Sequence, residues 1–174
     1  MKITAAVLFL FALWGGPVIA APDPVVTEGI VNAPVDAVWK AFTTKSGIEA
    51  WMVAKTEFEL RVGATWRTSY SRDSNLNDDT AIHHTILAFD PGRMLAFRTI
   101  KFPGNFPFPA VTGTWTVVYF ESAGTGKTRV TARMLGIEDD DQGQKMRAFF
   151  ERGNRTELDA LVKFFETGVP QVVR

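Results

Sequence analysis

The sequence predicts an α+β domain in which an antiparallel sheet packs against one long helix near the C-terminus. Residues 55–137 form a series of β-rich segments separated by turn residues, a pattern that favours hairpins over parallel crossovers. Residues 142–166 carry a broad apolar stripe at helical spacing. The length of 174 residues and the absence of an internal repeat indicate a single domain.

The N-terminus has the pattern of a secretory signal. Lys2 precedes an apolar run over residues 3–14, the breakers at 15–17 follow, and small residues lead up to Ala20. We expect cleavage after Ala20 and export to the periplasm or the medium. An uncleaved anchor is the alternative, although the run is shorter than the ~20 apolar residues of a spanning helix.

Composition excludes several classes of function. The 19 basic and 19 acidic residues balance, so no general attraction to nucleic acid or anionic lipid is expected. Cysteine is absent, which removes disulfides, thiolate nucleophiles and Cys-based metal sites. The 14 Phe and 5 Trp residues supply apolar area for a thick core or an aromatic-lined cavity.

The first structured segment passes from a strand to two short helices. Residues 21–24 form an extended lead-in, and residues 25–31 are expected to form a strand. Pro34 then opens a helix with an apolar face. Ser46 and Glu49 fit a capping box, which predicts a second short helix carrying Trp51.

Six further strands are predicted from β-rich runs and their turns, near residues 55–61, 64–72, 79–89, 94–102, 111–122 and 127–137. Alternation places Trp66, Thr68 and Tyr70 on one covered face. The same rule groups Trp115 with Tyr119. That assignment stays open, because Val118 and Phe120 are also apolar and a one-residue shift would invert it.

The long helix at residues 142–166 begins after three aspartates and ends at Gly168. Its stripe is interrupted at Gly153 and Asn154 and must lie on the sheet. The aspartates at 139–141 fit a helix start better than a calcium site, since the alternating ligands and glycine of an EF-hand are missing. The domain is expected to cover residues 25–168, with a tail at 169–174.

Four segments resemble one protein family. Residues 31–39 read VNAPVDAVW, Trp51 follows on the second short helix, residues 89–97 read FDPGRMLAF, and residues 128–132 read TRVTA. Together they resemble the family related to the C-terminal domain of the Hsp90 ATPase activator, within the START/Bet v 1-like (SRPBCC) superfamily. The resemblance implies a helix-grip fold, a curved sheet around the long helix. The chain departs from the family pattern at Asn154, where an aromatic residue is usual.

The resemblance also implies an apolar cavity between the sheet and the long helix. Large and polar side chains expected to face this space form the candidate ligand pocket: Trp51, Trp66, Tyr70, Phe97, Trp115, Tyr119, Phe150 and Asn154. The alternative is that they simply fill the core. A loop rich in Phe and Pro supplies a candidate lid, or else a rigid loop on the sheet, through Phe102, Phe106 and Phe108.

These observations predict an exported domain that binds a small apolar or amphipathic ligand, with no metal, no organic cofactor and no assigned catalytic residue. One alternative is a cyclase-like or hydratase-like enzyme using Tyr70, Tyr119 or a histidine. Another is a protein-interaction module, although ATP-dependent chaperone stimulation is not expected after export. His83 and His84 are adjacent on a strand, so they point to opposite faces and do not readily share a metal. The sequence leaves open which of them faces the cavity.

Overall fold

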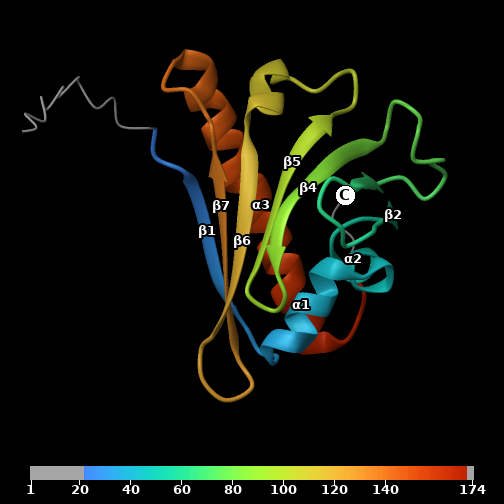
Figure 1. Ribbon diagram of the computed structural model, residues 1–174, viewed down its shortest axis with the longest axis vertical. Helices are drawn as coiled ribbons and strands as arrows, with labels where there is room; N and C mark the ends of the chain where they lie inside the picture. Colours follow the sequence, from blue (N-terminus) through green and yellow to red (C-terminus); the bar gives the residue numbers. More distant parts are fainter. Residues whose placement is uncertain (1–21, 172–174) are drawn as a thin grey trace, which may run out of the picture.

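A seven-stranded antiparallel sheet and a long helix, α3 (Asp141–Thr167), make up most of the computed structural model (Figure 1). The structure describes residues 22–171, so the predicted leader, residues 1–20, and residues 172–174 of the predicted tail lie outside the described residues. In chain order the strands are β1 (Val25–Val31), β2 (Lys55–Glu57), β3 (Thr65–Ser69), β4 (Ile82–Asp90), β5 (Met94–Lys101), β6 (Trp115–Ser122) and β7 (Thr128–Leu135).

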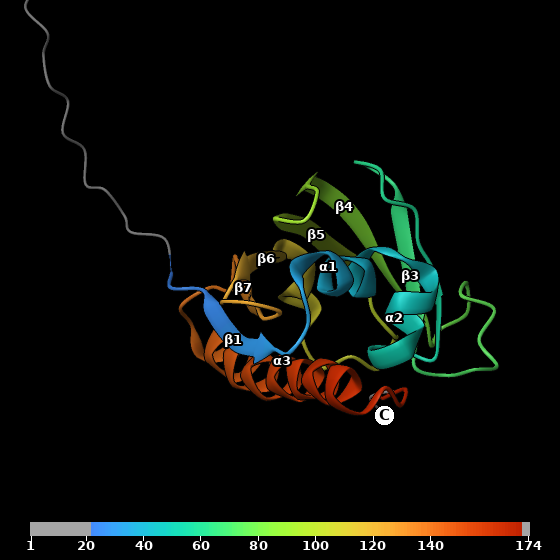
Figure 2. The ribbon, with the colours of Figure 1, turned by 90° about the horizontal axis from the view of Figure 1, so that it is seen from below.

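The strands lie side by side in the order β1-β7-β6-β5-β4-β3-β2, and each neighbouring pair is antiparallel. Two short helices, α1 (Val35–Thr43) and α2 (Lys45–Trp51), connect β1 to β2 and lie near one end of the sheet. Figure 2 shows the sheet curving while α3 runs across its open side. The predicted α+β class and helix-grip architecture are confirmed.

Helix α1 follows Pro34, as predicted, and buries Val38, Ala41 and Phe42. The predicted cap of α2 was wrong. Its N-cap is Thr44, whose side-chain oxygen accepts a hydrogen bond from the Gly47 amide at 3.1 Å, two residues earlier than the expected Ser46. Glu49 does not reach back to a capping residue but accepts from the amide of Thr56 at 2.9 Å, which ties α2 to β2.

Helix α3 matches its predicted boundaries to within one residue at each end. Asp140 caps its start, because its carboxylate accepts from the Gly143 amide at 2.7 Å. Gly168 ends it in the left-handed conformation, with φ of 66°. The helix is continuous through Gly153 and Asn154, so the interruption in the apolar stripe does not break the backbone.

Gly143→Ala and Gly153→Ala are expected to change stability in opposite directions. A Cβ on Gly143 would collide with the Glu138 carbonyl oxygen, whereas one on Gly153 would meet nothing within 4 Å. We expect the first substitution to lower the free energy of unfolding by about 1–3 kcal/mol. The second should raise it by about 0.5–1 kcal/mol, since alanine favours the helix. Urea denaturation measures both, and a stabilised Gly143→Ala variant would contradict the close packing at the start of α3.

Two clusters of buried apolar side chains hold the layers together. The larger one includes Trp51 and Trp66 together with Leu158 and Leu161 of α3, and the smaller one includes Met146 nearer the start of the helix. Burying each such side chain fully contributes roughly 1.5–3 kcal/mol. Helix α3 is therefore fixed to the sheet at two places along its length.

The structure corrects three details of the sheet. Strands β2 and β3 are shorter than predicted, and residues at the expected start of β6 form a 3₁₀ turn, η1 (Pro109–Gly113), because Pro109 opens a turn more readily than a central strand. Val118 and Phe120 are buried, while Tyr119 is 40% exposed. The prediction that Tyr119 shares an inner face with Trp115 was therefore wrong for Tyr119, since both faces of β6 carry apolar side chains and the buried ones at this point are Val118 and Phe120.

Candidate functional site

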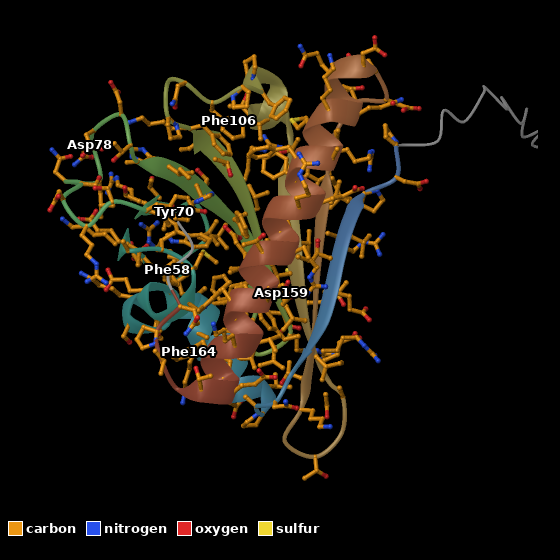
Figure 3. All side chains as sticks on the ribbon, turned by 180° about the vertical axis from the view of Figure 1, so that it is seen from behind. Phe58, Tyr70, Asp78, Phe106, Asp159 and Phe164 are labelled. Atoms are coloured by element: carbon orange, nitrogen blue, oxygen red, sulfur yellow. The ribbon has the colours of Figure 1, made fainter. Side chains whose placement is uncertain are left out.

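A pocket of about 170 Å³ lies between the inner face of the sheet and α3. Members of both apolar clusters reach it, so it occupies the space that neither cluster fills. Figure 3 shows α3 crossing in front of the sheet, with Tyr70 and Phe106 beside the helix. The aromatic part of the pocket wall consists of Phe42, Trp51, Trp66, Tyr70, Phe97, Phe102, Trp115 and Phe150.

All of the predicted wall residues line this pocket except Tyr119. Tyr119 lies on the outer face of β6, because the inner face there belongs to Val118 and Phe120. Threonines from four strands and one that follows η1 add hydroxyl groups to the wall: Thr27, Thr68, Thr99, Thr116 and, after η1, Thr114. The pocket is thus apolar over most of its surface, with a limited set of polar groups.

Tyr70 and Glu157 form a hydrogen-bonded pair in the pocket wall. Tyr70 follows β3 directly, and its hydroxyl donates to Oε1 of Glu157 on α3 at 2.8 Å. Burial raises the pKa of the Glu157 carboxyl, and the hydrogen bond from Tyr70 opposes that rise. The charge of Glu157 in turn raises the pKa of the Tyr70 phenol. This pair joins the short strand β3 to the middle of α3.

Sequence reasoning missed Glu157. The signal was its spacing: Phe150, Asn154, Glu157 and Leu161 follow one another at four, three and four residues, which places them on one face of a helix. An acidic side chain within an apolar stripe indicates either a satisfied buried group or a functional one. Here the acidic residue lies between Asn154 and Leu158, both of which also line the pocket.

His84 is the histidine that faces the pocket. Its Nδ1 lies 2.9 Å from the Thr99 hydroxyl, its Nε2 lies 3.5 Å from that of Thr68, and its ring centroid is 4.7 Å from that of Trp66. Burial, with a smaller contribution from the charge of His83, lowers the pKa of His84 to about 3. His83 points away, to the Leu76 carbonyl oxygen at 2.9 Å. The partners of His84 are therefore hydroxyl groups, and the imidazole is neutral at physiological pH.

The predicted lid residues gather beside the first half of α3. Phe102 and Phe106 stack with centroids 4.1 Å apart, and Phe106 and Phe108 each contact Phe149 of α3. Only Phe102 of the three predicted lid residues lines the pocket, where Phe150 also contributes. The loop therefore packs onto the helix as an aromatic cluster at one side of the pocket. Movement as a lid stays a prediction.

The polar loop between β3 and β4 is held together by hydrogen bonds to Asp78. Asp78 accepts hydrogen bonds from the side chain and the amide of Thr80 and from the Ser74 hydroxyl, all within 3.1 Å. These donors, with that of Thr80 contributing most, lower the pKa of Asp78 to about 2. Within residues 22–171 no group of three or more His, Asp or Glu side chains is placed to hold a metal ion. In the same range no helix is long and apolar enough to cross a bilayer.

The curved sheet, the helix it grips and the pocket between them define a protein of the helix-grip, START/Bet v 1-like class. The family model described as Activator of Hsp90 ATPase homolog 1-like protein matches residues 32–166. The chain belongs to this family. The match confirms the resemblance seen in the sequence motifs, and it covers α1, α2, most of the sheet and nearly all of α3.

Solved structures share the fold at low sequence identity. A protein from Mesorhizobium loti is 19% identical with a TM-score of 0.65, over 82% of this chain and 96% of that one. The Aha1 dimer from Colwellia psychrerythraea is 17% identical with a TM-score of 0.65, over 83% and 97%. DynU16 of the dynemicin biosynthetic locus is 22% identical with a TM-score of 0.67, over 86% of this chain and 49% of that one.

A comparison with curated protein sequences gave no match. The fold of this family is compatible with binding a small ligand. The same fold is also compatible with binding another protein. The choice among these functions therefore depends on the pocket of this chain.

Proposed function

We propose that this protein binds a small apolar or amphipathic molecule in the pocket between the sheet and α3, and that it does so outside the cytoplasm after removal of residues 1–20. The observation that carries the proposal is the composition of the pocket wall, in which aromatic rings from the sheet and helices surround a few polar groups. Sites for small ligands are typically apolar with a few polar groups that orient the guest.

The size of the pocket limits what it holds. Its volume of about 170 Å³ is close to that of an apolar cavity of ~150 Å³ that accepts one benzene-sized molecule. We therefore expect a single ring or a short chain to fill the interior. The remainder of a larger ligand would extend beyond the pocket or displace wall side chains such as Phe102.

The surroundings of His84 favour binding over catalysis. A general base of the common type is a histidine held by a carboxylate, with its free nitrogen directed at the substrate. His84 is instead held by the hydroxyl groups of Thr99 and Thr68, and burial keeps its pKa far below neutrality. Tyr119, one of the residues considered for an enzymatic role, lies on the outer face. A carrier or sensor is the function that these residues support best.

Native mass spectrometry of the protein purified from its own host tests this proposal. We expect a reproducible apolar mass to accompany the chain. The variant Ala132→Phe, which places a ring into the pocket from β7, should lose that mass. The matched variant Arg133→Phe adds the same ring to an exposed position of the same strand and should retain it.

Repeated preparations without any bound mass, or equal occupancy in both variants, would argue against a ligand in this pocket. The same spectra test export, because the intact mass should correspond to a chain lacking residues 1–20. A mass that includes these residues would contradict cleavage after Ala20, and it would leave the pocket proposal to be judged on the bound mass alone.

A further inference from the structure

We propose that Glu157 and Tyr70 form a recognition site for a protonated amine, so that the pocket selects an amphipathic amine over a fatty acid or an alcohol of the same length. The inference rests on the proposed function, because it names the chemical class of the ligand in that pocket. Three features of the wall carry it: its charge, the free oxygen of Glu157 and the position of the aromatic rings.

Charge in the pocket wall is one-sided. Among the described residues that line it, Glu157 is the single acidic group, and no lysine or arginine is present. The other titratable side chains in the wall are Tyr70 on the β3 side and His84 on β4. His84 is neutral in its buried site, so the protein supplies no cation to face the carboxylate. A fatty acid would therefore place its own carboxylate beside that of Glu157, with no cation from the protein between the two negative charges.

The carboxyl of Glu157 has acceptor capacity left over. Oε1 accepts from Tyr70 at 2.8 Å, and among the described residues no donor is bound to Oε2. Arg155, the nearest cation along α3, pairs with Asp159 at 3.0 Å and donates to the Glu28 carbonyl oxygen at 3.0 Å. Helix positions three and four residues from Glu157 are occupied by Gly153, Asn154 and other uncharged residues.

The half-buried carboxylate of Glu157 has a hydroxyl partner but no cation beside it in the wall, and a cationic ligand would supply that opposite charge. Aromatic rings add to the attraction, because an ammonium group near the face of Trp or Tyr gains a cation–π interaction. Trp66 lies on β3, Tyr70 comes four residues later and directly follows that strand, and both side chains line the pocket with Glu157. An alcohol would gain only one neutral hydrogen bond from the same groups.

Titration of the purified protein with octylamine, octanol and octanoate tests the inference at neutral pH. We expect octylamine to bind at least tenfold more tightly than octanol, and octanoate to bind most weakly. Glu157→Gln should reduce the preference for the amine to within about threefold. The control Glu151→Gln, at an exposed position of the same helix, should leave it unchanged.

A second measurement needs no variant, in case Glu157→Gln fails to fold. In the protein without ligand, burial raises the pKa of the Glu157 carboxyl. Affinity for octylamine should therefore increase with pH as Glu157 ionises, whereas affinity for octanol should stay level. Saturable binding of octanol or octanoate as tight as that of octylamine, or a level pH profile for the amine, would overturn the amine site and leave the proposed function standing. Absence of saturable binding by all three ligands would count against both.

Discussion

Trp51→Ala is expected to lower the free energy of unfolding by about 3–5 kcal/mol, the range for removing a buried tryptophan. The side chain is 2% exposed, its ring centroid lies 4.8 Å from that of Phe42, and its indole N–H donates to the Ala41 carbonyl oxygen at 3.0 Å. The substitution therefore creates a cavity and leaves a buried acceptor without its donor. Urea denaturation with the slope held constant between variants measures the loss.

Tyr119→Ala is the matched control for this prediction. It also removes a large aromatic side chain, but from the outer face of β6, where Tyr119 is 40% exposed. We expect a change below about 1 kcal/mol. A loss of similar size in the two variants would mean that the two sides of the sheet are not as different in packing as the structure shows.

Acidification is expected to destabilise the protein through His84. The pKa of His84 is about 3 in the folded chain, against an ordinary value of 6.5, so between these values the unfolded chain binds a proton that the folded chain does not. Stability contributed by the neutral imidazole is present above about pH 6.5 and is lost as the pH falls toward 3. The slope reaches about 1.4 kcal/mol per pH unit.

Glu157 acts in the opposite sense, because its raised pKa makes the folded chain bind a proton more readily than the unfolded chain above pH 4.5. The two effects are separated by comparing the wild type with His84→Gln across the pH range. We expect the difference in unfolding free energy between the wild type and His84→Gln to change with pH by the full slope given above for His84. His83→Gln, at the opposite face of β4, should keep most of that slope, and parallel curves for the wild type and His84→Gln would rule the mechanism out.

Local signals predicted most of the elements correctly. Gly63 and Gly92 have positive φ values and lie between consecutive predicted strands, 55–61 and 64–72 for the first and 79–89 and 94–102 for the second, and Gly168 ends α3. A turn of this kind depends on the backbone preference of one glycine, so it can be predicted from that residue alone. The prediction for the cap of α2 was wrong because Thr44 and Ser46 lie two residues apart and both are residue types that cap helices. The Thr56 amide donates a hydrogen bond to the Glu49 carboxylate, so Glu49 is engaged outside the helix and does not complete a capping box with Ser46.

Residues whose role depends on tertiary contacts could not be predicted in the same way. The inner face of β6 depends on its pairing with β5 and β7, and its own pattern allows both faces because Val117, Val118, Tyr119 and Phe120 are all apolar. Glu157 was missed because its role depends on its contact with Tyr70. The two residues are 87 positions apart in the chain, and only the folded structure brings them together.

The pairing of β1 with β7 has a consequence for how the chain folds. Val25 pairs with Met134 and Val31 with Thr128, so the first strand of the sheet joins a partner about a hundred residues away. Hairpins such as β3–β4 and β4–β5 close short loops and form quickly. Pairing β1 with β7 closes a much longer loop, which costs more chain entropy, so it is slower. The segment next to residues 1–20 is thus expected to remain open longest during folding, until the C-terminal third of the chain has been made and α3 can dock on β1.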